Sequence, residues 1–144
     1  GLGGRAARSL AYHLGRYADV RFTFVSTPGL RMNDDNKTYL SEKDIAFSET
    51  DALAGAMREA DVVYQTRIQK ERFDSAEEYE KYKGGFIIDR ALADAMKPGA
   101  IIIHPLPRVG EITPEVDDSP HAVYFKQVGY GLLVRMALLK MLIG

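Results

Sequence analysis

Residues 100–104 read Ala-Ile-Ile-Ile-His and form the most apolar predicted strand of the chain. A short apolar run without alternation is typical of a strand that is buried on both faces, as at the centre of a parallel sheet. Lys97-Pro98-Gly99 precedes the run as a turn, and Pro105 ends it on the other side. This stretch therefore predicts a parallel sheet whose faces are covered by the rest of the chain.

Strand-like and helix-like segments alternate around this stretch. The strand-like segments are rich in β-branched and aromatic residues, and the helix-like segments begin at capping residues such as Asp89. This alternation predicts an α/β fold, a three-layer sandwich with a mostly parallel central sheet and helices on both faces (Rossmann-like). The other predicted strands are residues 20–26, 45–48, 61–65 and 86–88, and the predicted helices are residues 5–17, 33–43, 50–60, 75–83, 89–96 and 124–142.

Composition and charge exclude several classes of protein. The 144 residues include 19 Lys and Arg against 20 Asp and Glu, so the chain lacks the excess positive charge of a nucleic-acid binder and gives no reason to expect a membrane surface. Cysteine is absent, which excludes disulfides, a thiol nucleophile and thiolate metal ligands. The three histidines share no metal-ligand spacing. We expect one domain over residues 1–144, located in the cytoplasm, with no metal and no cofactor.

Polar segments follow two of the predicted strands. Residues 66–72 (Thr-Arg-Ile-Gln-Lys-Glu-Arg) follow the strand at 61–65, and residues 105–108 (Pro-Leu-Pro-Arg) follow the strand at 100–104. Arg5 stands at the start of the first predicted helix. Ligands of parallel sheets bind beyond the carboxyl ends of the strands, so we expect these segments to meet at a binding site.

The side chains of these segments indicate a small dianionic ligand. The planar arginine side chain binds a carboxylate through two parallel hydrogen bonds, which lysine cannot imitate. A site that combines Arg5, Arg67 and Gln69 therefore suits a ligand with two carboxylates. Glu71 is then placed to orient Arg67.

Each feature also has a simpler structural interpretation. Gly1-Leu2-Gly3-Gly4 could suggest a phosphate cradle, but it does not match G-x-G-x-x-G. The charged run from Arg67 to Arg72 is compatible with a solvated loop, and His104 with a structural histidine whose hydrogen bonds are satisfied. The apolar stripe of the last predicted helix is most simply a core or interface surface.

The combination of motifs resembles the aspartate carbamoyltransferase family, specifically the aspartate-binding, carboxyl-terminal half of its catalytic chain. The resemblance covers essentially all 144 residues, and the strings T-R-I-Q-K-E-R and H-P-L-P-R together are highly specific. The motifs are Gly4-Arg5, Ser9-Leu10, Arg31-Met32, residues 66–73, residues 104–109, Glu111-Ile112, Tyr124-Phe125 and Gln127.

The resemblance implies a reaction and a set of substrate contacts. The family transfers the carbamoyl group of carbamoyl phosphate to L-aspartate, giving N-carbamoyl-L-aspartate and phosphate, in pyrimidine synthesis. By resemblance, Arg5 binds the α-carboxylate of aspartate, while Arg67 and Gln69 bind its side-chain carboxylate. The backbone carbonyls of Pro105 and Leu106 accept hydrogen bonds from the carbamoyl amide and the attacking amine.

Further residues have supporting roles by resemblance. Glu71 steadies Arg67, Arg72 forms a charged bridge to the other domain on closure, and Arg108 and Glu111 belong to the same supporting group. No catalytic residue is assigned within this domain. The Leu106-Pro107 peptide is expected to be cis.

The resemblance also implies partners. The chain is expected to be cut from a longer two-domain catalytic chain, with an amino-terminal carbamoyl phosphate domain as its partner, and to be inactive alone. Catalytic chains are expected to form a homotrimer, with or without regulatory chains. The last helix has apolar residues on more than one face, which suggests that it spans both domains. Gly110 stands where the family usually has Asp or Asn, and Gly1-Leu2-Gly3 replaces a more usual Lys-Tyr pair.

Three rival interpretations remain open. An ornithine carbamoyltransferase typically has His-Cys-Leu-Pro where this chain has residues 104–107, and Arg67 would serve a cationic substrate poorly. A catalytically inactive homologue kept as an assembly module is opposed by the retained Arg5, Arg67 and Gln69. A nucleotide-binding oxidoreductase domain is disfavoured because the glycine fingerprint is missing.

Overall fold

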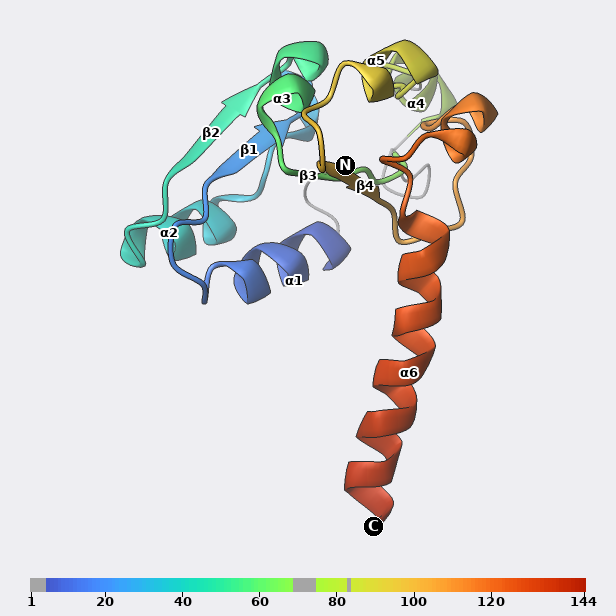
Figure 1. The fold of residues 1–144 in the computed structure, drawn as a ribbon. Coiled ribbons are helices and arrows are strands. Elements are labelled where there is room, and N and C mark those ends of the chain that lie inside the picture. Colours follow the sequence, from blue (N-terminus) through green and yellow to red (C-terminus); the bar gives the residue numbers. More distant parts are fainter. Residues whose placement is uncertain (1–4, 69–74, 83) are drawn as a thin grey trace.

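The computed structural model describes residues 5–68, 75–82 and 84–144 of the chain. Helices and strands alternate along it, and a long helix ends the chain (Figure 1). The elements, with η for 3-10 helices, are α1 (Arg5–Leu14), β1 (Phe22–Val25), η1 (Pro28–Leu30), α2 (Asp34–Glu42), β2 (Phe47–Thr50), α3 (Leu53–Glu59), β3 (Val62–Tyr64), α4 (Ala76–Tyr82), α5 (Arg90–Asp94), β4 (Ile101–Ile103), η3 (Pro114–Asp118) and α6 (Tyr124–Ile143).

The strands are parallel and form two hydrogen-bonded pairs. β1 pairs with β2, and β3 pairs with β4, where Val62 stands opposite Ile101. Ile102 of β4 also forms a parallel bridge to Ala122, so the apolar stretch has a neighbour on each side, as predicted for a central strand. The predicted α/β fold with parallel strands is confirmed. Within the described residues, the hydrogen bonds divide the strands into two pairs.

Helices lie on both sides of the strands. In Figure 1, α1 lies below β3 and β4, whereas α3 and α5 lie above them. The predicted cap of α5 is confirmed, because the backbone N–H of Leu92 donates to Oδ1 of Asp89 at 2.8 Å. Such a bond satisfies one of the free amides at the start of a helix, and it fixes where α5 begins.

One strand begins later than predicted. The sequence predicts a strand at residues 45–48, whereas β2 begins at Phe47. The cause is the end of α2, where Asp44 has a left-handed φ of 54° and the backbone N–H of Ile45 donates to the carbonyl oxygen of Leu40 at 2.9 Å. This helix-terminating turn uses Ile45, so strand pairing starts beyond it.

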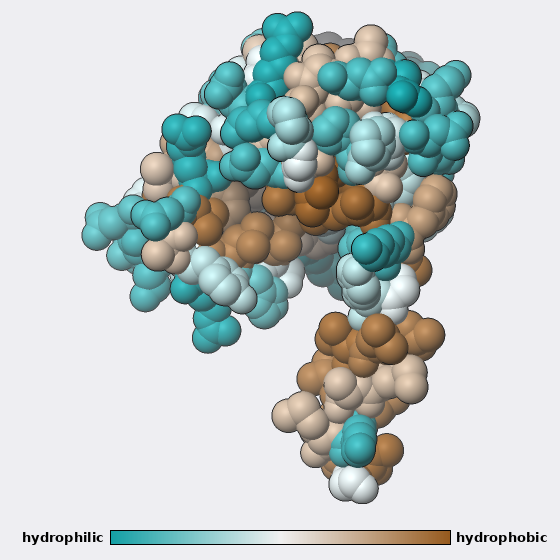
Figure 2. Space-filling view, viewed as in Figure 1, coloured by the Kyte–Doolittle hydropathy of each residue, from teal (hydrophilic) through white to brown (hydrophobic). Residues whose placement is uncertain are grey.

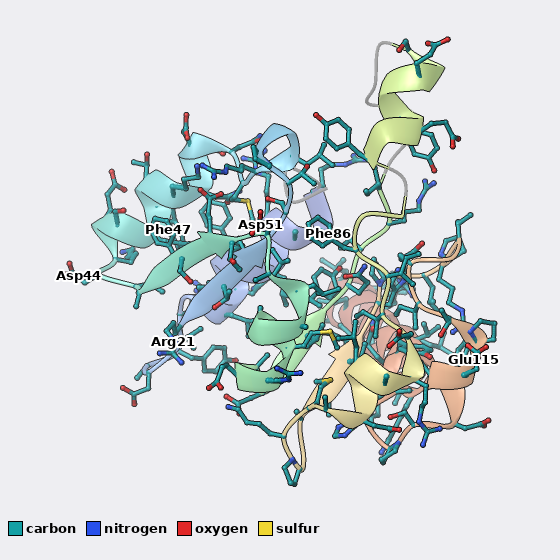
Figure 3. All side chains as sticks on the ribbon, turned by 90° about the horizontal axis from the view of Figure 1, so that it is seen from above. Arg21, Asp44, Phe47, Asp51, Phe86 and Glu115 are labelled. Carbon is teal, nitrogen blue, oxygen red and sulfur yellow. The ribbon has the colours of Figure 1, made fainter. Side chains whose placement is uncertain are left out.

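The apolar side chains form two separate cores. The larger core surrounds β4 and joins α3, α5 and the first turn of α6, and the smaller one packs under β1 and β2. Seen from above, Phe47 of β2 and Glu115 of η3 lie at opposite ends of the molecule (Figure 3). The buried residues are Met57, Ile88, Ala93, Met96, Ala100, Ile102, Ile112, Val116 and Tyr124 in the larger core, and Phe24, Met32 and Leu40 in the smaller.

The final helix α6 extends away from the rest of the molecule (Figure 1). Tyr124, its first residue, is its one buried residue, and the turns beyond it present apolar surface (Figure 2). α6 contacts β4 near its start, and most of its later turns are exposed in the described residues. In the described part of the chain, no helix is long and apolar enough to cross a membrane.

Candidate functional site

The pairing of β3 with β4 brings the two predicted site segments together. Tyr64 stands opposite Ile103, and the backbone N–H of Gln65 donates to the carbonyl oxygen of Ile103 at 3.1 Å. The chain therefore leaves both strands at the same edge, with Thr66 emerging beside His104. The sequence predicts that the two segments meet at this edge, and the register of β3 against β4 confirms it.

Arg67 lies at this edge, just beyond the end of β3. Its side chain is partly buried, and it lines a cavity of about 1260 Å³ that also includes Gly110 and Glu111 from beyond β4. The cavity runs between the two strand pairs, along α1 and β1. Because the cavity is lined by residues that follow β3 and β4, the guanidinium lies at the carboxyl edge of these strands, where ligands of parallel sheets bind.

Arg5 is the first residue of α1 and is exposed. The last turn of α1 leads into β1, so the helix runs back against the direction of the strands (Figure 1). This direction places its first turn toward the carboxyl edge of the sheet. Among the described residues, Arg5 does not line the cavity that contains Arg67.

Three predicted site residues lie outside the described residues. These are Gln69, Glu71 and Arg72, and Gly1-Leu2-Gly3 also lies outside them. Their predicted roles stay predictions.

His104 anchors the loop that follows β4. Its side chain is 1% exposed, and its Nδ1 accepts a hydrogen bond from the backbone N–H of Leu106 at 2.8 Å. Because Nδ1 accepts, the ring proton of the neutral imidazole is on Nε2, which donates to Oε1 of Glu111 at 2.7 Å. The backbone N–H of His104 donates to Oε1 of Gln127 in α6 at 3.3 Å. The interpretation of His104 as a satisfied structural histidine is thus confirmed.

Glu111 lies at the far end of the same loop and accepts two hydrogen bonds from it. Its Oε2 accepts a hydrogen bond from the backbone N–H of Val109 at 3.0 Å, while Oε1 accepts from His104. Burial acts to raise the pKa of Glu111, but the hydrogen bonds from His104 and from the backbone outweigh burial and hold this pKa below its ordinary value. Pro105 is exposed, Leu106 is partly buried, and the Leu106-Pro107 peptide is cis, as the resemblance implied.

Arg108 points into the body of this domain. Its Nη2 donates to Oδ2 of Asp117 in η3 at 2.6 Å, and its Nη1 donates to Oδ1 of Asp117 and to the Tyr124 hydroxyl. Its guanidinium also lies 5.8 Å from the centre of the Phe125 ring. The hydrogen bond from Arg108 holds the pKa of Asp117 below its ordinary value. Burial, assisted by Asp117, raises the pKa of Tyr124 to about 12.

The sequence did not indicate how these polar groups pair. Asp117 had no assigned role, and Gln127 and Tyr124 were recognised only as parts of motifs. The presence of polar residues on both sides of the prolines in residues 105–107 is a signal that could have indicated this pairing. A proline-rich loop has few backbone N–H groups, so side chains must supply the hydrogen bonds that fix its shape. No group of three or more acidic, histidine or cysteine residues that could hold a metal occurs in the described parts of the chain.

This edge is equipped to bind and align a ligand. It contains the guanidinium of Arg67 and a loop whose backbone is fixed by buried hydrogen bonds. Neither feature supplies a nucleophile. The geometry therefore suits the binding and orientation of an anionic ligand.

Comparisons with known proteins agree with this geometry. The family described as “Aspartate/ornithine carbamoyltransferase, Asp/Orn binding domain” matches residues 1–142. Aspartate carbamoyltransferase 3, chloroplastic, of Pisum sativum is 51% identical over 141 residues, which are 97% of this chain and 36% of that protein. The aspartate carbamoyltransferase catalytic subunit of Alkaliphilus oremlandii is 46% identical over 98% of this chain and 43% of its own length.

Solved structures give the same result. The catalytic subunit of M. jannaschii aspartate transcarbamoylase superposes with a TM-score of 0.88 at 47% identity, covering 99% of this chain and 46% of that one. Aspartate transcarbamoylase of Trypanosoma cruzi in complex with aspartate and phosphate has a TM-score of 0.79 at 35% identity, covering 94% and 42%. The chain spans less than half the length of each of these relatives. It belongs to the aspartate/ornithine carbamoyltransferase family and corresponds to the Asp/Orn binding domain of that family.

Proposed function

We propose that this chain supplies the aspartate site of an aspartate carbamoyltransferase. In the proposed reaction, the amine nitrogen of L-aspartate attacks the carbonyl carbon of carbamoyl phosphate. A new C–N bond forms, the bond from this carbon to the phosphate oxygen breaks, and the amine loses a proton. The products are N-carbamoyl-L-aspartate and phosphate. No covalent intermediate with the protein is required, because the carbonyl is already activated by its phosphate leaving group.

The observation that carries this proposal is the register of β3 against β4. It places the segment that begins Thr66-Arg67 beside the segment that begins His104-Pro105, at one edge and next to one cavity. Alignment of two substrates provides up to about 7–11 kcal/mol of catalysis, and a rigid edge that presents both a carboxylate-binding group and backbone carbonyls is suited to this task.

In the proposed complex, the arginines hold the two carboxylates of aspartate. Arg67, with Gln69, binds the side-chain carboxylate, and Arg5 binds the α-carboxylate. The carbonyls of Pro105 and Leu106 receive the amide and amine hydrogens of the reacting groups. Of these residues, Arg67 has the geometry that best supports its role, since it is partly buried and lines the cavity.

The proposed enzyme also needs a second domain and supporting residues of this chain. The carbamoyl phosphate site belongs to an amino-terminal domain, and Glu71, Arg72, Arg108 and Glu111 support the site or the closure of the two domains. We propose a homotrimer of catalytic chains as the assembly. The cytoplasm remains the proposed location, although the Pisum sativum relative is chloroplastic.

An assay of the full-length protein tests this proposal. Purified protein is incubated with carbamoyl phosphate and either L-aspartate or L-ornithine, and the carbamoylated product is quantified. We expect N-carbamoyl-L-aspartate and no citrulline, because Arg67, proposed to bind the side-chain carboxylate of aspartate, would repel the cationic side chain of ornithine. Citrulline as the main product would establish the ornithine enzyme instead. No product with either amino acid would favour an inactive assembly module.

A further inference from the structure

The loop after β4 holds a backbone shape that its sequence does not favour. Leu106 has a φ of 46°, in the left-handed region that a residue with a side chain rarely adopts. Pro105 and Pro107 have no backbone N–H, so the amide of Leu106 is the one hydrogen-bond donor of the main chain between them. The shape of the loop therefore depends on what this amide bonds to.

The partner of this amide is the imidazole of His104. The Leu106 N–H donates to Nδ1 at 2.8 Å, and the ring is almost completely buried. A ring that accepts at Nδ1 must keep its proton on Nε2, and the acceptor of that proton is Oε1 of Glu111 at 2.7 Å. Glu111 thus sets which nitrogen of His104 faces Leu106.

Glu111 also holds the other end of the loop. The side chain is 13% exposed, and Oε2 accepts from the backbone N–H of Val109 at 3.0 Å. The two oxygens of one carboxylate therefore connect the loop end at Val109 to the imidazole that holds Leu106. The result is a closed chain of hydrogen bonds around Pro105, Pro107 and Arg108.

We propose that His104 and Glu111 are a positioning pair for the carbamoyl transfer, acting through the backbone of the loop between them. This inference rests on the proposed function, in which the Pro105 and Leu106 carbonyls receive the reacting amide and amine. In this proposal His104 and Glu111 act through the backbone of the loop and not through contact with the reacting atoms. The pair fixes the direction of these two carbonyls, so its loss lowers the turnover number while aspartate binding through Arg5 and Arg67 is kept.

Two substitutions of His104 separate the two bonds of the ring. In His104→Asn, the amide oxygen takes the place of Nδ1 and still accepts from Leu106, but the side chain no longer reaches Glu111. In His104→Gln, the amide nitrogen takes the place of Nε2 and still donates to Glu111, but Leu106 loses its acceptor. Glu111→Gln keeps an acceptor for His104 and presents an N–H to the N–H of Val109.

In the full-length protein, we expect His104→Gln to lower kcat at least about tenfold while KM for aspartate changes less than about threefold. His104→Asn should lower kcat less, because the bond to Leu106 remains. The control is His121→Gln, since the Nδ1 of His121 lies 2.7 Å from the carbonyl oxygen of Ala100 at the opposite end of β4. This control should leave kcat and KM unchanged.

Hydrogen exchange of the loop amides tests the pair without any assay of activity. The Leu106 amide should exchange faster in His104→Gln than in His104→Asn, and the Val109 amide should exchange faster in Glu111→Gln. Unchanged exchange at both amides would overturn the proposal. So would equal losses of kcat and of aspartate affinity in His104→Gln, because a loss of folded protein or of the whole site would then explain the effect.

The same experiments distinguish the two proposals from each other. If the unmodified full-length protein makes no N-carbamoyl-L-aspartate, the proposed function fails, and exchange at Leu106 and Val109 still decides whether the pair shapes the loop. If His104→Gln does not fold, Glu111→Gln carries the test, because it removes only the bond to Val109. Fast exchange at Val109 with kcat unchanged would overturn the positioning role.

Discussion

The loop at residues 104–111 and the turns of α6 beyond Tyr124 differ in how far the rest of the domain contacts their side chains. In the loop, the buried imidazole of His104 and the carboxylate of Glu111 are both hydrogen-bonded within the domain. In α6, large apolar side chains such as Leu133, Leu139 and Met141 are 60%, 58% and 81% exposed. The polar groups of the loop are therefore paired within the domain, whereas α6 exposes apolar side chains to water, which is unfavourable.

This difference shows which parts of the proposed site are preformed. The loop that we propose to present the reacting groups is held by hydrogen bonds inside the chain. An apolar surface of the size of α6 marks a contact with another protein surface. We propose that the domain binds one substrate at the preformed loop and packs on another domain through α6, and the following predictions test both proposals.

The largest expected effect comes from Arg67→Ala in the full-length protein. The variant should raise KM for aspartate about a hundredfold, because a desolvated carboxylate loses a charged, bidentate partner worth about 3 kcal/mol. Binding of carbamoyl phosphate should change little, since its site is proposed to lie in the other domain. Steady-state kinetics with each substrate varied in turn provide the measurement.

The matched control is Arg58→Ala, which removes an exposed arginine of α3. It should leave both kinetic constants unchanged. An equal loss of affinity for both substrates in Arg67→Ala would contradict the assignment of Arg67 to the aspartate carboxylate.

A second prediction concerns the cover of α6 in the full-length protein. Met136 is 57% exposed in this domain, whereas Met32, Met57 and Met96 are at most 6% exposed. If α6 packs on another domain, peroxide should oxidise Met136 several-fold more slowly than an exposed methionine, as quantified by peptide mass spectrometry. The buried methionines provide the internal reference for full protection. Oxidation of Met136 at the rate of a free methionine would show that α6 stays uncovered.

The smallest effect is expected at the base of α6. Asp117→Asn should lower the free energy of unfolding at pH 7 by about 1 kcal/mol, because the partly exposed ion pair with Arg108 is lost. Since the folded pKa of Asp117 is depressed, its contribution is present above the unfolded pKa of about 4 and disappears as the pH falls through the folded pKa. The difference between the two proteins should therefore shrink at acid pH.

Urea unfolding at several pH values measures this difference. Asp118→Asn, at the exposed next residue, is the control and should match the unmodified protein at each pH. A difference for Asp117→Asn that stays constant down to the lowest pH would contradict the ion-pair explanation.

The sequence predicted the features that depend on local chemistry. Ala100 to His104 was correctly placed between neighbours, because an apolar run of this kind has few alternatives. Asp89 was correctly identified as a helix cap, since it needs only a backbone amide three residues away. The start of β2 was placed too early because the left-handed turn at Asp44 is not signalled by a glycine.

The pairing of side chains could not be predicted in the same way. His104 and Gln127 are far apart in sequence, and only the packing of α6 against β4 brings the backbone of one to the side chain of the other. The partner of Arg108 depends on the position of η3, which carries Asp117. The site segments were found because parallel strands end at one edge, whereas their internal contacts depend on the full three-dimensional arrangement.

The most direct test of the whole account uses the 144-residue chain by itself. The account places the groups that bind aspartate here and those that bind carbamoyl phosphate in a partner domain. Once circular dichroism has shown that the isolated chain is folded, it is mixed with both substrates and assayed for N-carbamoyl-L-aspartate beside the full-length protein. We predict product from the full-length protein and none from the isolated chain. Comparable turnover by both would contradict the account, because the complete site would then lie within these residues.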